Sequence, residues 1–121
     1  MSCLFRSLSY FITNVETEEL RNIITDYIEK DPILIAPDGR LSTYLSLDKR
    51  NLTDYTREMR KSSTWGGAIE IRAFCELFKI KVFVYVIRDN KFIEFVPSNY
   101  TDNSKFIKIS WNGSHYEPIK N

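Results

Sequence analysis

The amino-acid sequence predicts one α+β domain, in which helices pack with a mostly antiparallel central sheet. Two patterns lead to this fold class: apolar residues at helical spacing fill the first half of the chain, and β-branched and aromatic runs fill most of the second half. The chain has 121 residues, 43% of them hydrophobic and 27% charged, a balance typical of a globular protein with one core. We therefore expect residues 1–121 to form a single domain.

Two helices are expected near the start of the chain. Apolar residues recur at helical spacing from Leu4 to Ile12, which predicts a buried helix over about residues 3–13. The same spacing from Leu20 to Ile28 predicts a second helix. That helix should end at Asp31-Pro32, because a residue that precedes proline is pushed out of the α region.

The middle of the chain is expected to hold a loop and two more helices. Residues 33–51 contain a Pro-Asp-Gly turn signal and no clean period, so they predict a loop with at most a short helix. A third helix should follow with Leu52 and Met59 on one face, and a fourth should span about residues 68–78. Cys75 lies mid-helix among apolar residues and is expected to be an inert core thiol.

The last third of the chain reads as strands. The nearly continuous apolar run at residues 80–87 predicts a central strand buried on both faces. Asn112-Gly113 is a strong hairpin signal between two strands. The expected strands are residues 80–87, 91–96, 105–111 and 115–119.

Charge and composition exclude several classes of function. Seventeen basic and sixteen acidic residues give a net charge of +1, which argues against a protein that coats nucleic acid. No apolar run approaches the ~20 residues that span a bilayer, and no secretion signal is visible. Two distant cysteines and one histidine give no metal-ligand spacing. We expect a monomer in the cytoplasm or another reducing compartment, without metal, cofactor, nucleic acid or membrane.

One cysteine and one histidine at opposite ends of the chain form a candidate catalytic pair. Cys3 opens the first predicted helix, where the positive end of the helix dipole favours a thiolate. His115 is the only histidine and could take the thiol proton. Glu117, two residues later on the same side of a strand, could orient the imidazole, and Asn112 is the alternative. A terminal apolar cysteine and a structural histidine remain the simpler interpretation of these residues taken singly.

A glycine pair precedes the fourth predicted helix. In Trp65-Gly66-Gly67, the two glycines allow a backbone to approach a ligand closely or to adopt positive φ. A plain helix entry anchored by the tryptophan explains the same residues equally well.

Three segments together resemble the OTU (ovarian tumour) family of deubiquitinating cysteine proteases. They are Cys3–Leu8, Trp65–Ile71 and Ser110–Tyr116, and they occur in the family's order over nearly the whole chain. The resemblance implies a papain-like fold and hydrolysis of the isopeptide or peptide bond after the C-terminal Gly-Gly of ubiquitin or a ubiquitin-like modifier. It implies that Cys3 is the nucleophile and His115 the general base.

The resemblance also suggests where ubiquitin or polyubiquitin would bind. Gly-Gly has no side chains, so a narrow groove admits it, and acidic residues nearby would suit the arginines of the ubiquitin tail. The glycine loop is expected to support the site more than to take part in chemistry. The residues expected to line the groove are Trp65, Gly66, Gly67, Trp111, Asn112 and Tyr116.

The start of the chain departs from the family pattern. The family usually has Asp-Gly-Asn before the nucleophile, and here only Met1 and Ser2 precede Cys3. The resemblance thus implies a domain shortened at its N-terminus. Since losing one oxyanion donor costs on the order of 100-fold in rate, the alternative function is a weakened or inactive ubiquitin-binding module.

Overall fold

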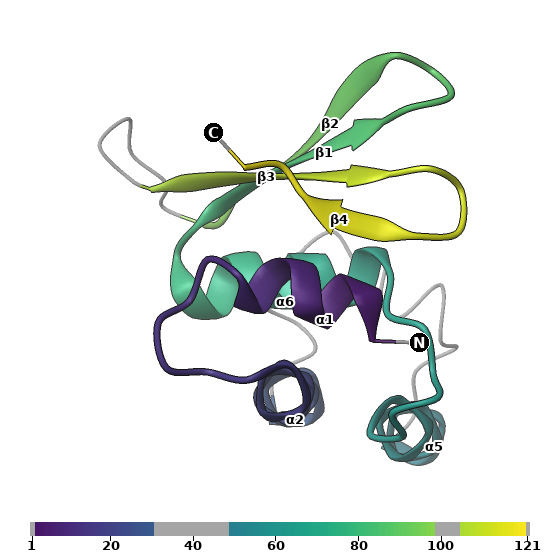
Figure 1. Ribbon diagram of the computed structural model, residues 1–121. Coiled ribbons are helices and arrows are strands. Elements are labelled where there is room, and N and C mark those ends of the chain that lie inside the picture. Colours follow the sequence, from purple (N-terminus) through teal and green to yellow (C-terminus); the bar gives the residue numbers. More distant parts are fainter. Residues whose placement is uncertain (1, 31–48, 99–104, 121) are drawn as a thin grey trace.

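The computed structural model describes residues 2–30, 49–98 and 105–120 (Figure 1). The described chain alternates between a helical first part and a strand-rich second part, as the sequence pattern predicts. None of the described helices is long and apolar enough to cross a membrane. The elements are α1 (Cys3–Ser9), α2 (Thr17–Lys30), α5 (Lys49–Met59), α6 (Ala68–Phe78), β1 (Lys81–Val86), β2 (Lys91–Phe95), β3 (Phe106–Trp111) and β4 (Tyr116–Pro118).

The strands form one sheet in the order β2-β1-β3-β4. β1 pairs antiparallel with β2 and parallel with β3, and β3 pairs antiparallel with β4. The predicted α+β class with a mostly antiparallel sheet is therefore confirmed, and β1 is a central strand as expected. The described helices all lie on one side of the sheet, with α1 and α6 next to it and α2 and α5 farther away (Figure 1).

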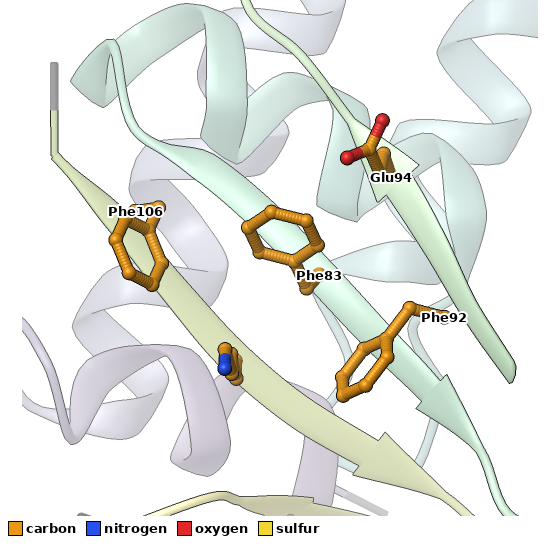
Figure 2. Close-up of a pocket in the computed structure, with 5 residues that line it drawn as sticks. Phe83, Phe92, Glu94 and Phe106 are labelled. Carbon is orange, nitrogen blue, oxygen red and sulfur yellow. The ribbon is translucent and has the colours of Figure 1, made fainter. Parts of the chain in front are cut away.

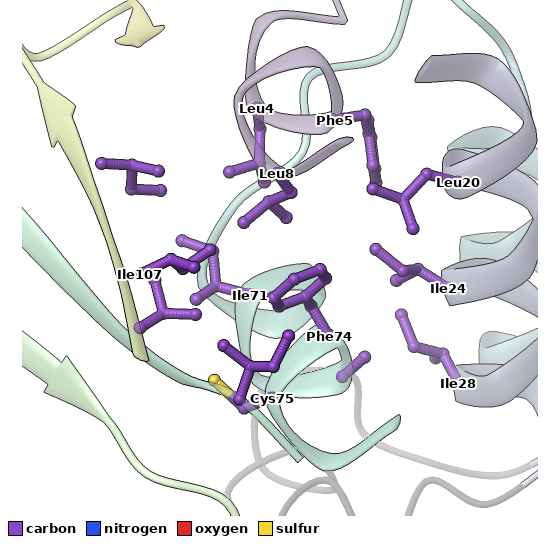
Figure 3. Close-up of a cluster of buried hydrophobic side chains, with 14 of the residues drawn as sticks. Leu4, Phe5, Leu8, Leu20, Ile24, Ile28, Ile71, Phe74, Cys75 and Ile107 are labelled. Atoms are coloured by element: carbon purple, nitrogen blue, oxygen red, sulfur yellow. The ribbon is translucent and has the colours of Figure 1, made fainter. Parts of the chain in front are cut away.

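Helix α6 occupies the middle of the hydrophobic core. Ile71, Phe74 and Cys75 of α6 are at most 1% exposed and lie between the sheet and the apolar side of α2 (Figure 3). Fully burying one such side chain contributes about 1.5–3 kcal/mol, so this cluster supplies much of the driving force for folding. The other labelled core residues come from α1, α2 and β3, namely Leu4, Phe5, Leu8, Leu20, Ile24, Ile28 and Ile107.

Three local predictions were wrong in detail. The first helix ends at Ser9 instead of about residue 13, because the amides of Phe11 and Ile12 bond to carbonyls three residues back and Asn14 adopts a φ of 65°. β1 is buried on one face only, since no described helix covers the other. The hairpin after β3 has a four-residue connection, so His115 precedes the returning strand. Most of the predicted loop at 33–51 lies outside the described residues.

The open face of the sheet carries a cluster of phenylalanines (Figure 2). The Phe83 ring meets Phe92 and Phe106 edge to face, at centroid distances of 6.0 and 5.6 Å. The ammonium of Lys108 lies 5.7 and 5.9 Å from the rings of those two neighbours. Edge-to-face packing and cation–π contacts stabilise aromatic groups that no other described element covers.

Gly66 is the closest point between α1 and the loop that leads into α6. A Cβ atom at Gly66 would lie 2.8 Å from Leu4 Cδ2 and 3.0 Å from Phe5 Cε2. Both neighbours are buried in the core, so neither side chain has room to move away. Only glycine permits this contact, whereas a Cβ at Gly67 would meet nothing within 4 Å.

The substitution Gly66→Ala is expected to lower the free energy of unfolding by about 1–3 kcal/mol, because the added methyl overpacks the contact with α1. Urea denaturation followed by circular dichroism measures the change. Gly67→Ser is the matched control, since it adds a larger side chain into open space at a helix N-cap, where serine is favoured. Equal losses in the two variants would contradict the close-contact interpretation.

Candidate active site

Cys3 lies at the N-terminal end of α1, which packs against β4. The residue is 5% exposed and its thiol is free. Its carbonyl accepts a hydrogen bond of 2.7 Å from the Ser7 hydroxyl, so the first turn of the helix is tied together. In Figure 1, this end of α1 lies on the same side of the view as the turn between β3 and β4.

The turn that carries His115 is fixed by the side chain of Asn112. The Asn112 Oδ1 atom accepts hydrogen bonds from the backbone amides of Ser114 and His115, at 3.0 and 2.8 Å. Gly113 has a φ of 105°, a conformation that favours glycine. These contacts hold the imidazole at the start of β4 with 43% of the side chain exposed. Asn112 therefore bonds to the backbone of the turn, and its described hydrogen bonds do not reach the ring.

Glu117 is the residue that the structure places beside the imidazole. Its Oε1 atom lies 3.4 Å from His115 Nε2, which leaves Nδ1 as the other ring nitrogen. Both side chains are partly exposed, so the pair contributes little to stability. In the parts of the chain that the structure describes, no group of three or more His, Cys, Asp or Glu side chains is placed to hold a metal ion.

The electrostatics of Tyr116 link the two ends of the chain. Burial raises the pKa of the Tyr116 hydroxyl, and the negative charges of Cys3 and Glu70 raise it further. Such an effect requires the thiol to lie within electrostatic reach of the residue that follows His115. The Cys3 side chain and Tyr116, the residue after His115, are therefore near each other in the fold, although 112 positions of sequence separate Cys3 from His115.

A cavity of about 450 Å³ opens beside this turn. Five of the six residues expected to line a substrate groove border it, namely Trp65, Gly66, Gly67, Trp111 and Tyr116. Asn112 is not in this lining, and its neighbours Gly113 and Ser114 take its place. Trp65 is half exposed at the opening, and the stacked rings of Trp111 and Tyr116 lie 6.0 Å apart.

Sequence reasoning missed part of this lining. Val84 and Val86 of β1 and Ile93 and Phe95 of β2 also face the cavity. Their pattern predicted strands, yet no local signal distinguishes a valine that lines a cavity from one that fills a core. No acidic side chain borders the cavity within the described residues, so the expectation of acids near the groove stays a prediction.

Glu70 is a further residue that sequence reasoning missed. Its carboxylate is 1% exposed, accepts a hydrogen bond of 2.7 Å from the Gly67 amide and accepts another from the Tyr55 hydroxyl. Burial raises the pKa of Glu70, and it also raises the pKa of Tyr55. A glutamate three residues after a helix N-cap is a known capping position, and that spacing could have identified it. Glu70 thus fastens the glycine loop to the start of α6.

The second cysteine lies apart from these groups. Cys75 is fully buried, and its thiol donates to the Phe95 carbonyl at 3.4 Å. Burial raises the pKa of this thiol to about 12. Since the thiolate is the reactive form, Cys75 is a structural residue, as predicted.

Glu70 should make stability depend on pH. Because burial raises its pKa above the ordinary 4.5, the folded protein holds this proton more tightly than the unfolded chain does. The resulting stabilisation is complete below about pH 4.5 and is lost as the pH rises through the raised pKa. Glu70→Gln removes this pH-dependent stabilisation, so the Tm of the wild type minus that of the variant should fall as the pH rises above about 4.5 through the raised pKa. The control is the half-exposed Glu94→Gln, and a pH-independent difference for Glu70→Gln would refute the assignment.

Comparison with known proteins identifies the family. The family model described as OTU-like cysteine protease matches residues 2–116. The ubiquitin thioesterase OTU1 of Mus musculus is 29% identical over 127 residues, which cover 98% of this chain and 33% of the mouse protein. The protein of the same name from Saccharomyces cerevisiae is 29% identical over 119 residues, with 98% of this chain and 36% of the yeast protein covered. The chain thus spans about a third of the length of these curated relatives.

Solved structures support the same assignment. An OTU domain in complex with ubiquitin superposes with a TM-score of 0.74 at 25% identity, over 97% of this chain and 62% of that one. The viral OTU domain protease from Farallon virus superposes with a TM-score of 0.75 at 17% identity, over 98% of this chain and 78% of the viral one, which shows the shared fold. Since the family model covers nearly the whole chain, this protein belongs to the OTU-like cysteine protease family.

Proposed function

We propose that this protein is a cysteine-type deubiquitinase, which hydrolyses the isopeptide or peptide bond after the C-terminal Gly-Gly of ubiquitin. The observation that carries the proposal is the packing of α1, which begins with Cys3, against β4, which begins directly after His115. Two relatives with similar sequences are named ubiquitin thioesterases, and one similar OTU domain was solved in complex with ubiquitin.

The geometry supports a distinct role for each residue. Glu117 lies against Nε2 of His115, so Nδ1 is the nitrogen left to take the Cys3 proton. The thiolate then attacks the carbonyl carbon of the final glycine, and the imidazolium returns the proton to the departing amine. Water hydrolyses the resulting thioester with the same imidazole as base, which releases the glycine carboxylate and restores the thiol.

The cavity suits a substrate tail without side chains. Its walls are apolar and aromatic, and the backbone of Gly66-Gly67 forms one side of it. A polypeptide backbone without side chains can approach such a glycine pair closely, whereas bulkier residues would meet the surrounding rings. Reaction through a free thiol also requires reducing conditions, so we place the activity in the cytoplasm or another reducing compartment.

A ubiquitin probe with an electrophilic C-terminus should label the wild type covalently and should not label Cys3→Ser. Cys75→Ser is the matched control: serine keeps a donor for the Phe95 carbonyl, and labelling should stay within about twofold of the wild type because a buried, protonated thiol does not react. Mass spectrometry of the adducts reads out both results. Noncovalent ubiquitin binding without any adduct would instead support an inactive binding module, and a panel of probes built on ubiquitin-like modifiers would identify a different modifier.

Removing the carboxylate beside the imidazole should slow the reaction. Glu117→Ala is expected to lower kcat/KM for a fluorogenic ubiquitin substrate about 10- to 100-fold, because the ring loses the partner that orients it. The side chain is 69% exposed, so the fold should be retained, which thermal unfolding checks. Glu94→Ala, another exposed glutamate on the sheet, should leave kcat/KM unchanged. Identical rates for Glu117→Ala and the wild type would exclude Glu117 as the orienting residue.

A further inference from the structure

The guanidinium group of Arg21 is buried next to the start of α1. Arg21 of α2 is 0% exposed, which is rare for arginine. Its Nε atom donates to Glu18 at 2.9 Å, and one terminal nitrogen donates to the Met59 carbonyl at the end of α5, at 2.8 Å. Its central carbon lies 4.4 Å from the centre of the Phe5 ring. Burying a charge costs a large amount of free energy, and these contacts offset that cost only while the guanidinium keeps this geometry. The position of the guanidinium is therefore closely defined.

The remaining terminal nitrogen of Arg21 reaches the residue that precedes the candidate nucleophile. It donates to the Ser2 hydroxyl at 3.1 Å and to the Ser62 carbonyl at 3.4 Å. The Ser2 hydroxyl in turn donates to the Glu18 carboxylate. Ser2 occupies the N-cap position of α1, where serine usually bonds to the helix amides, yet its hydroxyl makes no cap bond here. The hydroxyl is used to attach the helix start to α2.

The same guanidinium also contacts the segment that leads from α5 to the glycine loop. Ser62 belongs to the segment between α5 and the cavity lining, and Phe5 is one of the residues that a Cβ atom at Gly66 would meet, at 3.0 Å. One buried group therefore contacts both Ser2, directly before Cys3, and Ser62, in the segment that leads to the loop lining the cavity. A small shift of either would change the distance from the thiol to the imidazole and to the substrate carbonyl.

We infer that Arg21, acting through the Ser2 hydroxyl and the Phe5 ring, is a positioning residue that holds Cys3 in register with His115 for thiol activation. The inference rests on the proposed function, since it assigns to Arg21 and Ser2 a task in the same reaction. Neither residue touches the reacting atoms. Misplacing a reacting group by about 1 Å can cost on the order of 100-fold in rate, so loss of one anchor should be visible in kcat.

Ser2→Ala is the sharpest test, because it removes one half-buried hydroxyl and leaves the guanidinium and the core intact. It is expected to lower kcat for a fluorogenic ubiquitin substrate about tenfold with KM within about twofold of the wild type. Ser2→Thr restores a hydroxyl and should recover the rate. Arg21→Lys keeps the charge but loses the planar guanidinium, which donates to several partners at once. It should therefore lower kcat in the same way as Ser2→Ala.

A second readout separates positioning from general stability. The rate of Cys3 alkylation by iodoacetamide, measured against pH in the Cys75→Ser background, reports the thiolate that the imidazole stabilises. In Ser2→Ala and Arg21→Lys the midpoint of this profile should move to higher pH. The matched control is Arg60→Lys, because Arg60 also joins α2 to the end of α5, through Asp26 and Glu29 at the surface. Its profile and kcat should equal those of the wild type.

The results distinguish this inference from the proposed function. An unchanged kcat and an unchanged alkylation profile in Ser2→Ala would overturn the positioning role. A rate loss that merely follows a lower Tm, and that disappears at lower temperature, would overturn it as well. If the wild type reacts with iodoacetamide but not with the ubiquitin probe, the proposed function fails, and the alkylation profiles of the variants still decide whether Arg21 positions the thiol.

Discussion

The burial of α6 between the sheet and α2 is the constraint on which the rest of this structure depends. Phe74 and Ile71 of α6 are buried in the core, and their removal from water fixes where α6 can begin. The loop before it must then pass close to α1, and only Gly66 fits at the contact. The cavity lies where the start of α6 meets the ends of the strands. Hydrophobic packing of α6 therefore determines the geometry of the site.

Two buried titratable side chains, Glu70 and Arg21, fix this region more tightly than apolar packing alone could. Glu70 holds the glycine loop through the Gly67 amide, and Arg21 holds the start of α1 through Ser2. Apolar contacts tolerate small sliding movements, whereas a buried charge loses several kcal/mol if its partners move away. The two groups also interact, because the charge of Arg21 opposes the effect of burial on the pKa of Glu70.

The two faces of the sheet have different tasks. The face toward the helices carries Val82 and Val84 and continues into the walls of the cavity. The opposite face carries the phenylalanine cluster and, at its far strand, Glu117 beside His115. Strand geometry explains this division, because successive side chains of a strand point to opposite faces. Glu117 therefore meets the His115 side chain on the open side of β4, while α1 packs against this strand from the helical side.

The sequence by itself determined the local elements and the catalytic candidates. Helical spacing predicted α2, α5 and α6, apolar runs predicted the strands, and motif order predicted the family. Local spacing also linked His115 to Glu117, since residues two apart on a strand share a face. The sequence could not show that Ser9 ends the first helix, because Phe11 and Ile12 keep the helical pattern while they pack as a turn.

Only the tertiary structure decided how the distant groups meet. The buried contacts of Arg21 join residues up to 41 positions apart, and α1 reaches β4 across nearly the whole chain. In the sequence Arg21 appears as an ordinary charge on an amphipathic helix, and Glu70 as an acid near a helix start. Their burial depends on which helices pack together, and that follows from the sum of many weak apolar contacts that no local pattern records.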